Sequence, residues 1–170
     1  MMWSVLTLVG ADQKGIVAAV SRALFEAGCQ LAEASMMRLG GNFAVMLRVA
    51  HEQQLDLQQV LSQVCQEMNL HLHLDQDIEL SSQPIEPDVH ISVYGADRLG
   101  IVAQVTGALA EAGLNIIDLE TAVAGAPERP IYVMSLEGHA SQGMEALQQA
   151  IAGLDHNIDI SLTPIDTMRG

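Results

Sequence analysis

Residues 10–20 read GADQKGIVAAV, and residues 95–105 read GADRLGIVAQV. Over the 19 positions that begin at Gly10 and end at Gly28, 13 are identical in the second copy, which lies 85 residues further along the chain. Identity this dense at one fixed offset indicates an internal repeat, and such a repeat decides a fold more directly than local patterns do. The chain is therefore two copies of one unit of roughly 80 residues.

The boundary between the copies lies in residues 81–87, which read SSQPIEP. This stretch is polar and holds two prolines, a composition typical of loops and linkers. We accordingly expect a first domain over residues 1–81, a linker over residues 82–87 and a second domain over residues 88–170.

Each copy predicts the same order of secondary-structure elements. At the start of the first copy, Leu6 and Leu8 alternate with Val5, which is the period of a strand, and the following stretch has the apolar spacing of a helix. Gly28 and Gly113 suit the position just after a helix, where a left-handed backbone costs glycine little. The elements expected in the first copy are a strand over 2–9, a helix over 15–27, strands over 30–39 and 43–50 joined by a tight turn, a helix over 54–69 and a strand over 70–80.

The order strand–helix–strand–strand–helix–strand, found twice, is the ferredoxin-like βαββαβ plan. The expected fold class is α+β, with two tandem units whose antiparallel sheets each carry both helices on one face. In the second unit we expect the hairpin of the second and third strands to be longer, through residues 125–130. The other face of each sheet is open, and we expect aliphatic residues there, namely Val5 with Val45 or Leu47. Such a face favours packing of the two units or a homo-oligomer such as a dimer.

The composition excludes several classes of protein. Hydrophobic residues make up 49% of the chain, enough to form a core, so a mostly disordered chain is excluded. Acidic residues outnumber Lys and Arg by 21 to 7, which disfavours direct binding of nucleic acid, because that binding depends on cations that neutralise phosphates. No apolar stretch approaches the roughly 18 residues of a membrane span. The first residues lack the basic start of a secretory signal, so we expect a cytoplasmic protein without a membrane contact.

The repeated turn leads a strand into a helix, where the first backbone amides have no acceptor within the helix. The helix dipole adds positive potential there, so the main chain alone can hold a small carboxylate. Gly15 and Gly100 lack side chains and let a ligand approach the backbone closely. Asp97 or the side-chain oxygen of Asn115 could accept hydrogen bonds from an ammonium group, which would complete a site for a free amino acid. In the alternative interpretation, Asp12 and Asp97 only cap the helices, and the glycines only turn the chain.

The two turns, Asp12–Val17 and Asp97–Val102, resemble the first turn of the ACT domain, a small amino-acid-sensing module. The second unit continues with Gly113–Ile116, which is similar to the start of the second strand in that family. Two such units in one short chain, with no catalytic domain, resemble the glycine cleavage system transcriptional repressor family.

The resemblance implies a ligand site at each turn. The implied ligand-binding residues are Asp97, Arg98, Leu99, Gly100, Ile101, Asn115 and Ile116 in the second unit, and Asp12, Lys14, Gly15, Ile16 and Gln30 in the first. Lys14 and Leu99 replace the family's usual proline, and Gln30 replaces its asparagine at the start of the strand. The resemblance further implies a small amino acid, glycine above all, as the ligand, and a LysR-type transcriptional activator of the glycine cleavage operon as the partner.

Two other functions are compatible with the sequence. A stand-alone regulatory subunit could give feedback inhibition of a metabolic enzyme, and an acylphosphatase-like enzyme, which shares the ferredoxin-like plan, would depend on Arg98. The chain holds no HExxH, no Gly-x-Ser-x-Gly and no P-loop, so we expect a regulatory protein without catalytic residues or a cofactor. His71, His73, Asp75 and Asp77 share one strand face and are metal-ligand types, but neighbours on one straight strand rarely converge on an ion. We expect a solvated edge strand there and no metal site.

Overall fold

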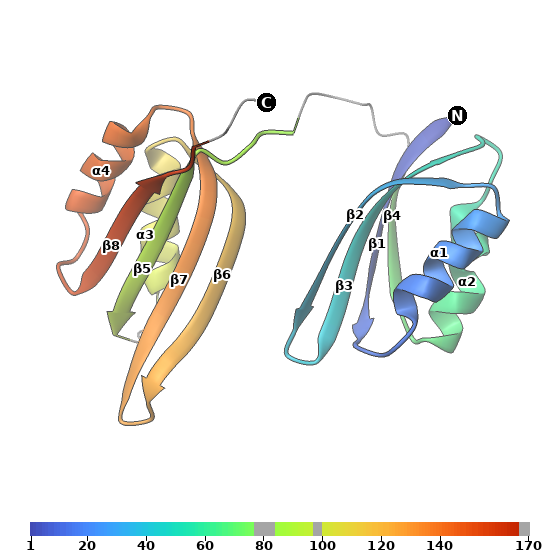
Figure 1. Cartoon of the computed structure of the whole chain (residues 1–170), viewed down its shortest axis with the longest axis horizontal. Coiled ribbons are helices and arrows are strands. Elements are labelled where there is room, and N and C mark those ends of the chain that lie inside the picture. Colours follow the sequence, from blue (N-terminus) through green and yellow to red (C-terminus); the bar gives the residue numbers. More distant parts are fainter. Residues whose placement is uncertain (77–83, 97–99, 167–170) are drawn as a thin grey trace. The chain divides into compact units, whose positions relative to one another are not determined.

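The computed structural model describes residues 1–76, 84–96 and 100–166. The chain divides into two compact units, Met1–Ser82 and Gln83–Gly170. In each unit the described residues form four strands and two helices in the order βαββαβ, which confirms the predicted fold class (Figure 1). The expected linker lies partly outside the described residues, so its bounds stay a prediction. No helix in the described part of the chain is long and apolar enough to cross a membrane.

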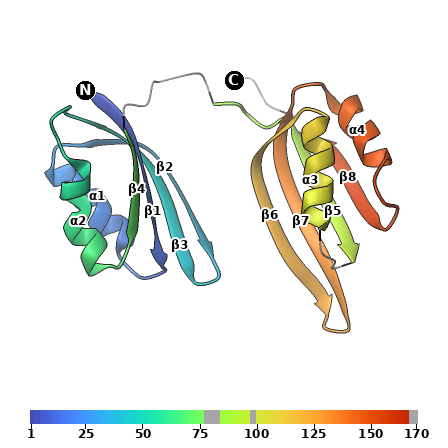
Figure 2. The ribbon, with the colours of Figure 1, turned by 180° about the vertical axis from the view of Figure 1, so that it is seen from behind.

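The first unit is a four-stranded antiparallel sheet with the order β2-β3-β1-β4. Its elements are β1 Met2–Ala11, α1 Ile16–Glu26, β2 Gln30–Leu39, β3 Asn42–His51, α2 Leu57–Glu67 and β4 His71–Gln76. Both helices lie on one face of this sheet (Figures 1 and 2). The predicted hairpin between β2 and β3 is confirmed, with Gly40 at φ 56° and Gly41 at φ 79° in the turn.

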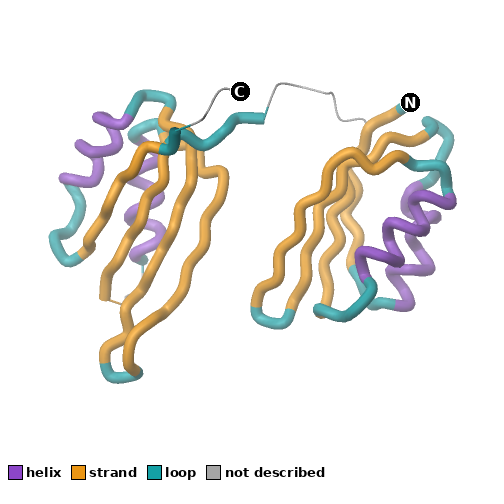
Figure 3. Tube along the Cα trace, in the orientation of Figure 1, coloured by secondary structure: helices purple, strands orange, loops and turns teal. Residues whose placement is uncertain are grey.

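The second unit repeats this plan with the strand order β6-β7-β5-β8 (Figure 3). Its elements are β5 Val89–Ala96, α3 Ile101–Glu111, β6 Leu114–Ala126, β7 Arg129–Ala140, α4 Met144–Ala152 and β8 Ile158–Pro164. The longer hairpin expected in this unit is confirmed, because β6 and β7 have 13 and 12 residues where β2 and β3 have 10 each. The two strands stay paired until only two residues separate them. Gly125, at φ 92°, lets the strand continue opposite Pro130.

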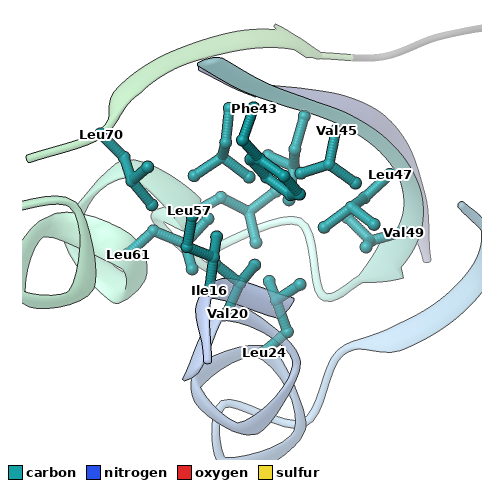
Figure 4. Close-up of a cluster of buried hydrophobic side chains, with 12 residues drawn as sticks. Ile16, Val20, Leu24, Phe43, Val45, Leu47, Val49, Leu57, Leu61 and Leu70 are labelled. Atoms are coloured by element: carbon teal, nitrogen blue, oxygen red, sulfur yellow. The ribbon is translucent and has the colours of Figure 1, made fainter. Parts of the chain in front are cut away.

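The core of the first unit lies between the sheet and its two helices (Figure 4). Leu6 and Leu8 of β1 are fully buried and belong to the same cluster as Val20 and Leu24 of α1 and Leu61 of α2. These positions recur at the strand and helix periods that the sequence predicts. Burial of each large aliphatic side chain contributes about 1.5–3 kcal/mol to folding, so this cluster holds the helices on the sheet.

The open face of the first sheet differs from the expectation. Val45 and Leu47 lie in the core, because β3 pairs with β1 so that these residues stand opposite Leu8 and Leu6. The prediction that Val45 or Leu47 belongs to the open face is therefore wrong. Met46, between them, faces the open side and is 53% exposed.

A polar pair is buried in the same unit. The Oγ of Ser4 lies 2.9 Å from Nε2 of His51, and both residues are almost fully buried. Nδ1 of His51 lies 2.8 Å from the carbonyl oxygen of Glu52, which can only accept a hydrogen bond. Nδ1 therefore donates, and in the neutral ring Nε2 accepts the hydroxyl proton of Ser4. Every polar atom of the imidazole is thus satisfied.

Candidate functional site

The first repeated turn connects β1 to α1 and is built on Gly15. Gly15 has φ 87° and ψ 3°, in the left-handed region that glycine enters freely. Its carbonyl oxygen accepts a hydrogen bond of 2.9 Å from the amide of Ala19, which starts the helix. A Cβ added to Gly15 would meet no atom within 4 Å, so the backbone conformation, not lack of space, requires glycine here.

Three amides at the start of α1 are free. At α2, by contrast, the carboxylate of Asp56 accepts hydrogen bonds from two amides of the first turn. Among the hydrogen bonds of the described residues, none uses the amide of Ile16, Val17 or Ala18. Unpaired amides at a helix start carry the positive end of the helix dipole and attract anions. The three amides at the start of α1 can therefore donate hydrogen bonds to an acceptor outside the helix.

Asp12 does not cap α1. Its Oδ2 lies 2.5 Å from Nη2 of Arg38 on β2, and its amide donates a 2.9 Å hydrogen bond to the carbonyl oxygen of Gly41. Both contacts attach the turn to the β2–β3 hairpin. The interpretation of Asp12 as a helix cap is therefore wrong, while the same interpretation of Asp97 falls outside the described residues.

An open hollow of about 470 Å³, named here the polar hollow, lies at this turn. Its lining residues are Asp12, Gln13, Lys14, Gly15, Ile16, Val17, Ala18, Met36, Arg38 and Phe43. The lining brings two cations and one carboxylate beside the three free amides. The amides and cations are donors for a carboxylate, and Asp12 is an acceptor for an ammonium group. The polar hollow can thus hold a small zwitterion.

Gln30 is the one predicted residue of the first unit that does not line the polar hollow. It begins β2 opposite Ala50, and Arg38 lies eight residues further along the same strand. Eight residues of extended strand span about 26 Å. Within its own unit, Gln30 therefore lies far from the turn.

Six lining residues were not predicted. Gln13, Val17 and Ala18 adjoin the predicted turn in sequence, whereas Met36, Arg38 and Phe43 come from strands. Strand pairing places the last three, because Arg38 stands opposite Phe43, and Phe43 stands opposite Gly10 at the end of β1. One signal was available in the charges, since Arg38 is one of only four Lys or Arg residues in positions 1–85. It also precedes the glycine turn that the sequence predicts.

The second repeated turn has the same backbone at its glycine. Gly100 has φ 85° and ψ 0°, and Ile101 after it begins α3 and is buried. Three predicted residues of this turn lie outside the described residues: Asp97, Arg98 and Leu99. Asn115 and Ile116 follow the other end of α3, and a helix of 11 residues spans about 16 Å. One unit alone therefore does not bring Gly100 and Asn115 together.

The histidine face of β4 shows one contact between a histidine and a carboxylate. Nε2 of His73 lies 3.2 Å from Oδ1 of Asp75, and both side chains are exposed, while Asp77 is outside the described residues. In the described ranges, no three His, Cys, Asp or Glu side chains are placed to hold a metal ion. Cys29 and Cys65 are free thiols, and burial raises the pKa of each, which favours the protonated and unreactive form.

The sequence model of the ACT domain matches residues 4–75, and a second ACT-domain model matches residues 89–152. The chain belongs to the ACT-domain family. This is a regulatory fold, and ACT domains bind small amino acids. The polar hollow of the first ACT domain has hydrogen-bond donors and an acceptor of the kinds that a small amino acid requires.

Two solved structures match this ACT-domain protein over almost its whole length. An unknown protein from Galdieria sulphuraria is 26% identical over 96% of this chain and 98% of its own, with a TM-score of 0.80. A candidate glycine cleavage system transcriptional repressor is 19% identical over 96% of this chain and 97% of its own, with a TM-score of 0.71. The second likeness establishes a shared fold. No curated protein matches the chain.

Proposed function

We propose that this ACT-domain protein is an amino-acid-sensing regulator whose ligand is held at the repeated turn. The observation that carries the proposal is the polar hollow, where three free amides of α1 line the same space as Asp12, Lys14 and Arg38. The carboxylate of a free amino acid would take hydrogen bonds from the amides and cations, and its ammonium group would donate to Asp12. A free amino acid satisfies both kinds of partner at once.

The ion pair between Asp12 and Arg38 offers a route from binding to a change of structure. Their side chains are 25% and 68% exposed, and exposed ion pairs are worth only about 0–1 kcal/mol. A zwitterion could therefore pair with both side chains, its carboxylate with Arg38 and its ammonium group with Asp12, at little cost in free energy. Because Arg38 belongs to the edge strand β2, this exchange would loosen the edge strand from the turn. A ligand that prefers one arrangement shifts the population toward it, which is what a sensor requires.

We further infer that glycine is a ligand of this regulator and that its output is transcription. The support is the resemblance of the repeated turns to the glycine cleavage repressor family, together with the fold shared with a candidate member. The net charge of −14 disfavours contact with DNA by the protein itself. Control would therefore pass through a DNA-binding partner, a LysR-type activator of the glycine cleavage operon.

A thermal-shift screen of the full chain with each of the twenty amino acids tests the sensor. A ligand that binds only the folded state raises the melting temperature as its concentration exceeds Kd. We expect glycine to raise it at millimolar concentration. A screen in which no amino acid moves the melting temperature would refute the proposal.

A mobility-shift assay with operator DNA tests the regulatory output. We expect the protein alone to leave duplex DNA unshifted at physiological salt, and to change the shift given by an activator in a glycine-dependent way. A shift by the protein alone would overturn the indirect mechanism. Co-purification with a metabolic enzyme, and no effect on any activator, would favour the feedback-subunit alternative.

A further inference from the structure

A second hollow in the first unit, named here the apolar hollow, lies between α1 and β2 and has a volume of about 190 Å³. Its lining is apolar except for Ser21: α1 contributes Val17 and Val20, β2 contributes Ala34 and Met36, and buried residues of β3 form the floor. The hollow exists because the helices leave β2 uncovered, and all ten residues of that strand are exposed. An apolar group placed there would remove apolar surface from water.

The apolar hollow adjoins the polar hollow. Val17 and Met36 line both, and Val17 is also one of the three residues of α1 with a free amide. Val17 and Met36 are 47% and 54% exposed, so their side chains contact solvent when no ligand is bound. The apolar hollow continues one helical turn further along α1, at Val20 and Ser21. A charged space and an apolar space are thus joined side by side.

We propose that the first unit binds a free α-amino acid with a branched aliphatic side chain. The carboxylate and ammonium groups occupy the polar hollow, and the side chain occupies the apolar hollow across Val17 and Met36. This inference rests on the proposed function, because it assumes that the turn holds the main-chain groups of an amino acid. It adds the class of side chain, which the turn alone does not determine.

The apolar hollow is large enough for a side chain of three or four carbons. An apolar cavity of about 150 Å³ is large enough to hold benzene, and this hollow measures about 190 Å³. Each buried CH₂ group improves affinity by about fourfold. Leucine, with three more carbons than alanine, should therefore bind about 50-fold more tightly than alanine.

The second unit differs at the residues that shape this site. Ala34 stands opposite Leu47, and Leu119 stands opposite Leu136, the residue of β7 that corresponds to Leu47 in the repeat. A leucine therefore occupies in the second unit the position that alanine leaves small in the first. By the same register Val123 replaces Arg38, so one of the two cations of the polar hollow has no counterpart on β6. Selection of an aliphatic side chain is accordingly a property of the first unit.

Calorimetry of the full chain with leucine, isoleucine, alanine and glycine tests this inference, using Ala34→Leu as the variant. The new leucine should fill the apolar hollow, lower the affinity for leucine at least tenfold and leave the affinity for alanine unchanged. Ser35→Leu is the matched control, because it adds the same side chain to the same strand opposite Met46, on the open face. This control should leave both affinities unchanged.

Several results would overturn the inference. Ala34→Leu with unchanged leucine affinity would do so, as would a change of oligomeric state without a change of leucine affinity, which would assign the hollow to a protein contact. Alanine and glycine binding without a gain for leucine would refute this inference alone, whereas binding of no amino acid would refute the proposed function too. If Ala34→Leu does not fold, NMR decides on the unmodified protein. We expect nuclear Overhauser effects from the leucine methyls to those of Val20 and Ala34, and their absence in the bound state would contradict the assignment.

Discussion

Val17 of α1 and Met36 of β2 mark the boundary between the polar hollow and the apolar hollow of the first unit. The turn beside them supplies amides that the main-chain carboxylate of any amino acid can use. In the proposed complex, the boundary residues meet the atoms that distinguish one amino acid from another. In this proposal the backbone amides recognise the class of ligand and the boundary side chains select among its members, and Val17 takes part in both.

Val17→Asp should abolish amino-acid binding in the first unit without unfolding it. The new carboxylate would occupy the positive potential at the start of α1, where an acidic residue contributes about 0.3–1 kcal/mol. Because Val17 is half exposed, we expect the free energy of unfolding to change by less than about 1 kcal/mol. Calorimetry and urea unfolding measure the two effects. Phe25→Asp, at the far end of α1 and 79% exposed, is the control and should bind the amino acid with the affinity of the unmodified protein. If Val17→Asp also bound with that affinity, the amides of α1 would not be part of the binding site.

Arg38→Gln should weaken amino-acid binding about tenfold, because a hydrogen bond to a charged group is worth about 1.5–3 kcal/mol and this one is partly exposed. The matched control is Arg48→Gln. Arg48 forms a similar ion pair with Glu33 at 2.7 Å and lies over the ring of Trp3, away from the turn. Titration calorimetry of both variants separates the two cations. Equal effects of the two substitutions would mean that only net charge matters.

Gly15→Val should destabilise the first unit by about 1–3 kcal/mol, because valine is strained at φ 87° although nothing obstructs its Cβ. Gly15→Asn should cost less, because asparagine tolerates the left-handed region. Hydrogen exchange in α1 measures the difference. If both variants lost the same stability, side-chain contacts would have to replace backbone strain as the explanation.

Ser4→Ala should lower the stability of the first unit by about 1–3 kcal/mol, since it leaves Nε2 of buried His51 without a partner. In the second unit, Ser135 lies 2.9 Å from Nε2 of His90, but that pair is only partly buried. Water can replace its hydroxyl, so Ser135→Ala should cost less than about 1 kcal/mol. Exchange of the amides of β1 and β7 reports the two costs separately. A larger loss in Ser135→Ala would contradict the role given to burial.

The fold could be predicted because the repeat and the apolar periods are local properties of the sequence. The buried face of β3 could not be predicted, because Val45 and Met46 are both apolar and the sequence alone allows either of them to point into the core. Only the register with β1, which places Val45 opposite Leu8, decides which of them is buried.

The candidate site could be predicted only at the turn itself. Gly15 and its neighbours are contiguous in sequence, whereas Arg38 reaches Asp12 through two successive strand pairings, β2 with β3 and β3 with β1. Gln30 was predicted to belong to the site, but the length of β2 separates it from the turn within one unit. Spacing along the sequence predicts neither the closeness of Arg38 to Asp12 nor the distance of Gln30 from the turn.

The most direct test of the central claim is an amide NMR titration of the full chain with glycine and with leucine. If the free amides of α1 hold the ligand carboxylate, the resonances of Ile16, Val17 and Ala18 should move most and should saturate together. Leucine should in addition move the methyl signals of Val20 and Ala34. Resonances of these three amides that stay in place, while either amino acid binds elsewhere on the chain, would contradict the account.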